Sequence, residues 1–315
     1  MKKVGIVGVG RVGSTIAYSL TEDTGIDEMI LVAAHNSKAV GEASDIIQGL
    51  PFKKNIRIRA GEISDIKNVD IVILSFGAPE KIGESRYAPM LKNIEILKSI
   101  IKVIIENNPD CILVVISNPV DIMTYVATRI SGFPKNRVIG LGTLIDDARL
   151  KAILSGELQV SDKSIHTYVI GEHGQSPTIV WSLSDIAGID INKAVSLMDK
   201  PINNFSLQSV NYTLENMAFK VWEQKGANTF CIADATRRLV TAILRDEHVI
   251  LPVSTLLEGE YGLENVCLSV MAIIGREGVI RTIEQPISED EKAQLYNSAA
   301  HVLDIIRDNK QLWQN

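Results

Sequence analysis

A glycine-rich stretch near the start of the chain restricts its fold more than any other feature. The apolar run Val4 to Val7 ends in Gly8-Val9-Gly10-Arg11-Val12-Gly13, which has the spacing G-x-G-x-x-G. The pattern follows a predicted strand and begins a predicted helix, the context in which it is informative. Gly8 makes the tight turn, Gly10 lets the backbone approach a pyrophosphate, and Gly13 allows close helix–strand packing. Because free N–H groups at a helix start bind phosphate, the stretch predicts a dinucleotide-binding βαβ unit.

Strand-like and helix-like segments alternate through the first half of the chain. The runs Met29 to Ala34, Val69 to Phe76 and Cys111 to Ile116 are almost entirely apolar, as expected of strands covered on both faces of a parallel sheet. Between the last two runs, apolar residues recur at helical spacing: Leu91, Ile94, Leu97, Ile100, Ile101 and Ile104. We therefore expect an α/β fold, with a Rossmann-type doubly wound parallel sheet over residues 1–142.

The pattern changes after residue 142. Long helical segments and strand-rich stretches follow, at roughly 205–224, 229–245, 247–257 and 265–274. Ser288 and Glu291 fit a capping box at the start of a last helix. We expect residues 143–315 to form an α+β substrate-binding domain, with a ligand cleft at its interface with the first domain.

Composition narrows the partners and the location. The formal net charge is −6, so the chain gains nothing from attraction to a phosphate backbone and we expect no nucleic-acid partner. No apolar run approaches the roughly 20 residues that span a bilayer, and we expect no membrane partner. The three cysteines, Cys111, Cys231 and Cys267, share no close spacing. This argues against a disulfide framework or a metal site, and favours the cytoplasm.

The dinucleotide signature departs from the usual pattern at the second strand. NAD-binding units usually carry Asp or Glu about 20 residues after the glycines, where it accepts from the ribose hydroxyl. Ala33 stands there instead, and no carboxylate follows before Lys38. The change removes one attraction for NAD and one repulsion against a 2′-phosphate, which Asn36, Ser37 and Lys38 could hydrogen-bond. We expect NAD as cofactor with relaxed or NADP-leaning use; the alternative is NAD use with the ribose bound by backbone groups.

Four further motifs follow in order: Gly83-Glu84-Ser85-Arg86, Ser117-Asn118-Pro119-Val120-Asp121, Asp146-Asp147-Ala148-Arg149 and Gly171-Glu172-His173-Gly174. Their order and spacing resemble those of the L-lactate/malate dehydrogenase family, and most of all its bacterial L-lactate and L-2-hydroxyisocaproate dehydrogenases. The resemblance covers essentially the whole chain. It implies an NAD(P)-dependent oxidoreductase, acting on CH–OH donors, that interconverts a 2-oxo acid and an L-2-hydroxy acid.

His173 matches the family's catalytic histidine, and its residue type suits proton transfer because a histidine pKa lies near neutrality. Asp146 occupies the position of the carboxylate that fixes the histidine tautomer and favours its charged form. Arg149 matches the arginine that binds the substrate carboxylate, for which a guanidinium offers two parallel N–H bonds. Asp146 and Arg149 share one face of a predicted helix.

Other positions match the family's contacts with substrate and cofactor. Arg86 lies in the loop from Pro79 to Pro89, which in the family closes over the substrate so that its arginine polarises the carbonyl. Asn118 resembles the residue that contacts both the substrate carbonyl and the cofactor. The resemblance implies further cofactor contacts from Val12, Gly77, Ala78 and Ile116.

Two positions depart from the family pattern beside the substrate. Glu80 stands where lactate dehydrogenases usually have Gln and malate dehydrogenases usually Arg. A carboxylate there repels a second substrate carboxylate, but desolvating it against the methyl group of pyruvate is also costly; alternatively, Glu80 turns to solvent or faces a polar or cationic side chain. Asn228 stands where lactate-type enzymes usually have Thr, and it adds both a donor and an acceptor. A 2-oxo acid other than pyruvate is therefore a hypothesis.

Regulation and assembly follow only from the resemblance. His166 and Lys151 occupy positions at which allosteric bacterial lactate dehydrogenases bind fructose bisphosphate, although the family has Arg where Lys151 stands; two ordinary surface residues are the alternative. The resemblance also implies a homotetramer. Two other functions stay open: a malate dehydrogenase, which Glu80 argues against, and a non-catalytic dinucleotide-binding protein, which would not need the four catalytic-site side chains.

Overall fold

The computed structural model describes residues 1–315 except 23, 54, 79–87, 198–205 and 314–315. Its first half contains a parallel sheet with the spatial order β3-β2-β1-β4-β5-β6, the strand order of a Rossmann fold. The strands are β1 (Lys3–Val7), β2 (Glu28–Val32), β3 (Arg57–Ala60), β4 (Ile71–Leu74), β5 (Ile112–Val115) and β6 (Val138–Gly140).

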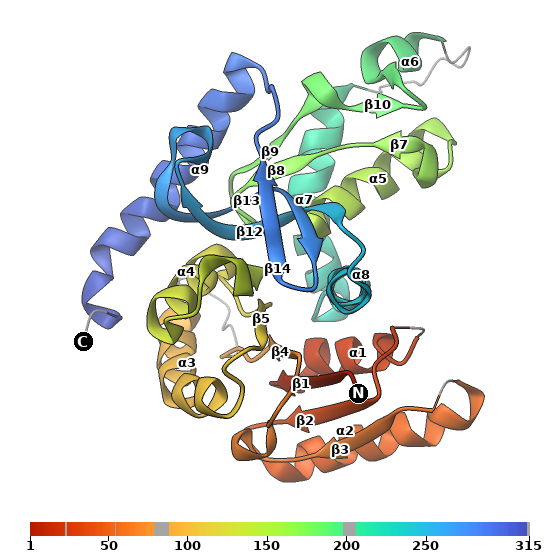
Figure 1. The fold of residues 1–315 in the computed structure, drawn as a ribbon. Helices are drawn as coiled ribbons and strands as arrows, with labels where there is room; N and C mark the ends of the chain where they lie inside the picture. The colour runs from red at the N-terminus through yellow and green to blue at the C-terminus, as the bar shows by residue number, and fades with distance from the viewer. Residues whose placement is uncertain (23, 54, 79–87, 198–205, 314–315) are drawn as a thin grey trace.

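Helices cover both faces of this sheet (Figure 1). They are α1 (Arg11–Ser19), α2 (Asn36–Gly49), α3 (Ala88–Asn107) and α4 (Val120–Ser131). Alternate strand residues belong to opposite cores: Ile6 and Ile73 pack with α1 and α2, whereas Val7 and Leu74 pack with α3 and α4. Because β4 and β5 are buried on both faces, they read as continuous apolar runs, whereas the edge strand β3 carries two arginines.

The second half adds helices and mainly antiparallel strands. Its helices are α5 (Leu144–Leu158), α6 (Ile191–Leu197), α7 (Leu207–Lys225), α8 (Phe230–Arg245) and α9 (Glu289–Asp308). Its strands are β7 (Ile165–His166), β8 (Val169–Gly171), β9 (Pro177–Ile179), β10 (Asp185–Ile186), β11 (Ile189–Asp190), β12 (Val249–Glu258), β13 (Glu264–Gly275) and β14 (Gly278–Ile283). The predicted class, a doubly wound parallel sheet followed by an α+β half, is confirmed.

The two halves share one sheet. Ser254 on β12 pairs with Gly140 on β6, so that the described strands of the parallel sheet continue into an eleven-stranded sheet. A Cβ on Gly140 would lie only 2.3 Å from Thr124 Oγ1, so this close contact needs glycine. Helix α8 also packs on α1, in the same core as β1. The start of α8 and the turn before it, which contacts Arg11, thereby lie beside the glycine-rich turn of the first half.

The stretch from Ile165 to Ile170, which the sequence alone suggests is a single apolar strand before His173, divides into the two strands β7 and β8. β7 pairs with β10 in a small sheet, while β8 pairs with β9 and β13 in the large one. The chain divides between them at Thr167, whose hydroxyl donates to Asp147 at 2.7 Å. The last helix agrees with its prediction, since Ser288 and Glu291 form the expected capping box.

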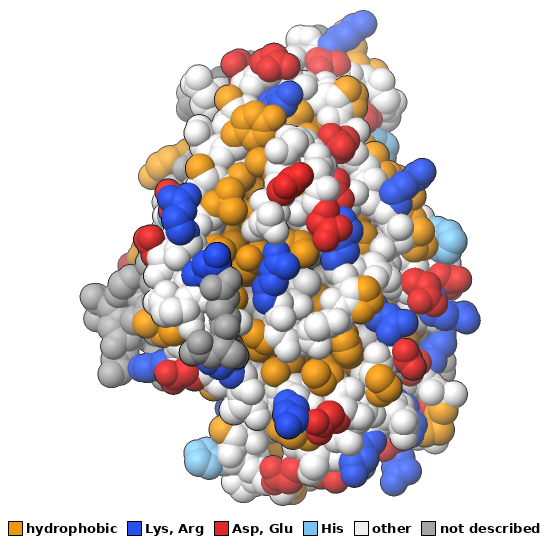
Figure 2. All heavy atoms as spheres, turned by 60° about the vertical axis from the view of Figure 1, so that its left-hand side comes forward, with side chains coloured by type: hydrophobic (Ala, Val, Ile, Leu, Met, Phe, Trp, Pro, Cys, Tyr) orange, Lys and Arg blue, Asp and Glu red, His pale blue; other side chains and the backbone are white. Residues whose placement is uncertain are grey.

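The surface in Figure 2 carries Lys and Arg side chains interspersed with Asp and Glu, separated by small hydrophobic areas. Several large hydrophobic side chains elsewhere in the described residues are well exposed, including Phe52, Tyr212 and Phe230. None of the helices in the described ranges combines the length and the apolar character that a membrane crossing needs.

Candidate active site

Helix α5 and strand β8 bring the two central side chains together. Thr143, the residue before α5, is buried; its N–H donates to Ser269 Oγ at 2.9 Å, and its hydroxyl donates to the Val169 carbonyl oxygen on β8. Asp146 lies in the first turn of α5, and His173 follows β8 directly. Because Thr143 bonds the start of α5 to β8, the segments that carry Asp146 and His173 are held next to each other.

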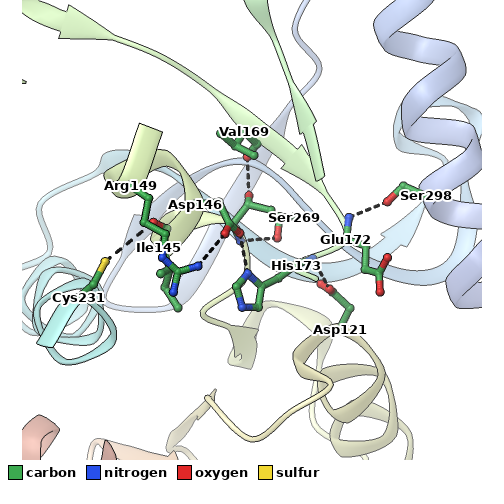
Figure 3. Close-up of polar contacts among 11 residues, drawn as sticks. Asp121, Ile145, Asp146, Arg149, Val169, Glu172, His173, Cys231, Ser269 and Ser298 are labelled. Carbon is green, nitrogen blue, oxygen red and sulfur yellow. Dashed lines mark hydrogen bonds and ion pairs between the residues drawn. The ribbon is translucent and has the colours of Figure 1, made fainter. Parts of the chain in front are cut away.

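The carboxylate of Asp146 contacts both cationic side chains of the site (Figure 3). His173 Nδ1 lies 2.6 Å from Asp146 Oδ2, and Arg149 Nη1 donates to Asp146 Oδ1 at 3.2 Å. Because a carboxylate only accepts, the first contact assigns a proton to Nδ1 and leaves Nε2 as the ring atom that exchanges protons with a substrate. The His173 side chain is 18% exposed, so the imidazole is accessible yet largely shielded from water.

The surroundings of His173 favour its protonated form. Burial alone lowers the pKa of the imidazole, but the charge of Asp146 and the hydrogen bond to it raise the pKa, against a smaller opposing effect of Arg149. The net result is a pKa above the ordinary histidine value, because a nearby opposite charge stabilises the imidazolium. Such a group can donate a proton at neutral pH and take one back in the reverse direction.

Two of the three glycines predicted to bind a dinucleotide occupy positions where a side chain would collide, and the third faces open space. Gly8 has a φ of 98°, and a Cβ there would lie 2.4 Å from the backbone of Phe76. A Cβ on Gly13 would lie 2.1 Å from the Gly8 carbonyl oxygen. Gly10 precedes α1, and a Cβ there would meet nothing within 4 Å. This open space in front of free helix N–H groups fits a pyrophosphate.

The other predicted cofactor contacts lie around the carboxyl ends of the parallel strands, where open α/β sheets bind their ligands. Val12 lies half-buried in α1, Ala33 directly follows β2, and Lys38 is exposed in the first turn of α2. The loops after β4 and β5 carry the rest: Gly77, Ala78, Ile116 and Asn118.

Asn93 connects these last two loops, and the sequence analysis did not identify it. The residue is buried in α3; its Oδ1 accepts from the Ala78 N–H and its Nδ2 donates to the Asn118 carbonyl oxygen, both at 2.8 Å. The two bonds set the spacing of the loops beside the predicted cofactor crevice. An amide next to Ile94 in an otherwise apolar helical stripe is the signal that could have found it.

The turn between α7 and α8 lies beside both halves of the candidate site. Asn228 Nδ2 donates to the Ala218 carbonyl oxygen at 2.8 Å, so one of its donors is already engaged. Arg11, in the glycine-rich stretch, donates to the Gly226 carbonyl oxygen at 3.2 Å. Cys231 on α8 contacts the Ile145 carbonyl oxygen, next to Asp146 (Figure 3). The turn therefore contacts the predicted cofactor loop and lies close to the start of α5.

Four other positions were predicted to contact the substrate or an effector, and the structure describes two of them. Glu80 and Arg86 lie outside the described residues. Lys151 Nζ lies 2.8 Å from Asp147 Oδ2, and His166 Nδ1 lies 3.0 Å from Asp185 Oδ1. Each of these two side chains thus has a carboxylate beside it, which would compete with a phosphate group. Binding of fructose bisphosphate stays a prediction.

Family models match both halves of the chain. The model of the lactate/malate dehydrogenase NAD binding domain matches residues 2–140, and that of the lactate/malate dehydrogenase alpha/beta C-terminal domain matches residues 143–312. The chain belongs to the lactate/malate dehydrogenase family. The resemblance inferred from the motifs is confirmed, and with it an oxidoreductase that acts on CH–OH donors and has an NAD-binding domain.

Bacterial relatives of this family extend over almost the full length. The chain is 42% identical to the L-lactate dehydrogenase of Acetivibrio thermocellus over 307 residues, which cover 98% of this chain and 97% of the relative. It is 41% identical to L-lactate dehydrogenase 1 of Clostridium acetobutylicum over 297 residues, which cover 94% and 95%. The crystal structure of the minor L-lactate dehydrogenase from Enterococcus mundtii, in its ligand-bound form, matches with a TM-score of 0.92 at 34% identity and covers 98% of each chain.

Proposed function

We propose that the protein is an NAD-dependent L-2-hydroxy-acid dehydrogenase whose reaction centre consists of Asp146, His173 and Arg149. One observation carries the proposal: a single buried carboxylate contacts an imidazole at 2.6 Å and a guanidinium at 3.2 Å. Reduction of a 2-oxo acid needs from the protein a proton for the oxygen and a cation for the carboxylate. These three side chains supply both, whereas a protein that only binds a dinucleotide would need neither.

The match to the family and the contacts with Asp146 support the following roles. Arg149 donates N–H groups to the substrate carboxylate and so orients the carbonyl towards His173 Nε2. Bound NADH supplies the hydride for the carbonyl carbon. Protonated His173 gives its Nε2 proton to the carbonyl oxygen, while Asp146 keeps the ring in the required tautomer and stabilises its charge. By family match, we propose that Arg86 polarises the carbonyl and that Asn118 contacts it.

The protonation state of His173 predicts the pH dependence of the reaction. Reduction needs the imidazolium, so kcat/KM should be level below the raised pKa of His173 and fall as the pH rises through it. Asp146→Asn removes the charge that raises this pKa, so the fall should begin at a lower pH. Oxidation needs the neutral ring, so its acid limb should move to lower pH as well. Profiles of kcat/KM in both directions measure the shift; unchanged limbs in the variant would exclude His173 as the titrating group.

The cofactor proposal is NAD with weak discrimination against NADP. Ala33 places a methyl group where a carboxylate usually repels the 2′-phosphate, and the exposed Lys38 follows in the first turn of α2. The family supports NAD, and the missing carboxylate supports relaxed selection. Comparing kcat/KM for NADH and NADPH with the same 2-oxo acid tests it: a strong preference for NADH would leave the NAD proposal intact and remove the NADP part.

The substrate proposal is a 2-oxo acid with a single carboxylate. Glu80 disfavours the second carboxylate of oxaloacetate, and Asn228 offers an amide where the substrate side chain is expected. The relatives named L-lactate dehydrogenase favour pyruvate, although Glu80 and Asn228 leave room for a larger or more polar acid. We expect NADH consumption with one or more of pyruvate, 2-oxoisocaproate, phenylpyruvate and amide-bearing 2-oxo acids, and little with oxaloacetate. Oxaloacetate as the best substrate would instead support a malate dehydrogenase.

We also propose a homotetramer in the cytoplasm, with residues 1–142 binding the cofactor and residues 143–315 the substrate. Cys111, Cys231 and Cys267 are all free thiols, as suits a reducing compartment. The tetramer is proposed from the resemblance to the family.

A further inference from the structure

Asp121, the last residue of the Ser117 to Asp121 motif, has a buried carboxyl group that is not among the three groups of the proposed reaction centre. It lies in the first turn of α4 and is 2% exposed. Its Oδ1 accepts no hydrogen bond of good geometry within the described residues. A buried carboxyl with an unsatisfied oxygen is costly, so the contact made by its other oxygen is informative.

That second oxygen bonds to the main chain of the central histidine. Asp121 Oδ2 accepts from the His173 N–H at 2.8 Å (Figure 3). The preceding N–H, that of Glu172, donates to Ser298 Oγ on α9 at 2.7 Å. Gly171 turns the chain here with a φ of 89°. Because two successive N–H groups bond to two different helices, the loop presents the Cα of His173 at one defined place.

The charge of Asp121 also acts on the imidazole. Burial raises the pKa of Asp121 to about 7, although Ser254 and the His173 N–H lower it in part. The titratable groups around it are His173 and Glu172 from the loop after β8, and Cys267 on β13. In its charged form Asp121 raises the pKa of His173, in the same direction as Asp146 and against Arg149, both on α5.

We propose that Asp121 is a positioning residue for proton transfer, which fixes the main chain of His173 by its hydrogen bond and favours the protonated ring by its charge. The inference rests on the proposed role of His173. Asp146 orients the ring, and Asp121 places the backbone from which the ring extends. Since Arg149 carries the contact with the substrate carboxylate, loss of Asp121 should affect kcat more than KM.

Two variants of Asp121 separate the effect of its hydrogen bond to the His173 N–H from the effect of its charge. Asp121→Asn keeps an oxygen that can accept from the His173 N–H but removes the charge. Asp121→Ala removes both and leaves a donor without its partner. Asp147→Asn is the matched control, because Asp147 is a carboxyl of similar burial on α5 whose oxygens accept from Thr167 and Lys151 instead.

Asp121→Asn should move the alkaline limb of 2-oxo acid reduction to lower pH, with a small loss of kcat. Asp121→Ala should lower kcat by about 10- to 100-fold, because small misplacements of a catalytic group have effects of this size. KM for the 2-oxo acid should change much less in both variants. Asp147→Asn should leave the limb and kcat close to those of the unmodified protein.

The titration of the His173 ring, followed by NMR and assigned with His173→Asn, gives a readout that needs no turnover. We expect its pKa to fall in Asp121→Asn and to stay unchanged in Asp147→Asn. An unchanged ring titration and an unchanged kinetic limb in Asp121→Asn would overturn the proposal, as would equal effects in the Asp147 control. If the unmodified protein reduces no 2-oxo acid, the proposed function fails, and the ring titration still decides the contact of Asp121 with His173.

Discussion

Replacing His173 with Asn should lower kcat for reduction of a 2-oxo acid by about 10²- to 10⁴-fold, the range that a positioned general acid contributes. The amide can still donate to Asp146, which lies 2.6 Å from His173 Nδ1, so the local structure should persist. However, the amide does not transfer a proton to a substrate at neutral pH. Arg149 keeps its contact with Asp146, and KM for the 2-oxo acid should therefore change little. Steady-state kinetics with NADH measure both constants.

The matched control for this variant is His248→Asn. His248 Nε2 also contacts a carboxylate, Asp246 Oδ1, at 3.2 Å, but both side chains are well exposed in the turn between α8 and β12. The control should keep full activity. NADH binding, followed by fluorescence, should be equal in all three proteins because the glycine-rich turn is untouched. Retention of more than about a tenth of kcat in His173→Asn would assign the proton transfer to another group.

Replacing Arg149 with Lys should lower kcat/KM by about 100-fold, since the second hydrogen bond to the substrate carboxylate is lost and a bond to a charged group contributes about 1.5–3 kcal/mol. The Arg149 side chain is 10% exposed and already bonds to Asp146 with one N–H group. A lysine retains the charge beside His173, so the pH profile should keep its shape. It cannot form two parallel N–H bonds with a carboxylate. The loss should therefore appear for every 2-oxo acid tested.

Arg237→Lys is the matched control for Arg149. Arg237 also pairs with an aspartate three residues away in a helix, Asp234, at 3.3 Å, but that pair is exposed on α8. Exposed pairs of this kind contribute little, so its kinetics should match those of the unmodified protein. Equal kcat/KM in Arg149→Lys and Arg237→Lys would contradict the role of Arg149 as the carboxylate-binding group.

Features with a local cause could be predicted from the sequence. Gly8, Gly10 and Gly13 are constrained by a single turn and the packing of one helix on one strand, and their spacing shows it. Asp146 and Arg149 share a helix face because they are three residues apart. The capping box at Ser288 is equally local. In each case neighbouring residues determine the geometry, so a short motif carries the information.

Features that depend on pairing between distant segments could not be predicted. β6 has three residues, Val138–Gly140, too few for a periodic pattern, yet its contact with Ser254 joins the two halves into one sheet. The stretch from Ile165 to Ile170 reads as one largely apolar strand. Its division between two sheets depends on β10 and β13, more distant segments that pair with β7 and β8.

The candidate site also contains contacts between distant segments that could not be predicted from the sequence. His173 and Asp121 belong to two separate sequence motifs. The hydrogen bond between them joins residues that are 52 positions apart, so neither motif predicts it. Asn93 bonds to the loops of Ala78 and Asn118 from a helix between them in sequence. Such bonds depend on which elements the fold places side by side. Contacts between distant segments of the candidate site were therefore harder to predict than the residues within its motifs.

The most direct test of the account follows the hydride itself. The protein is incubated with NADH carrying deuterium at the transferred position and with the best 2-oxo acid, and the product is analysed by mass spectrometry and chiral chromatography. We predict an L-2-hydroxy acid with one deuterium on the carbon that bore the carbonyl, formed at least about 100-fold more slowly by His173→Asn. Binding of NADH without any hydroxy acid product, across the whole panel and with either cofactor, would contradict the account and favour a dinucleotide-binding protein without catalysis.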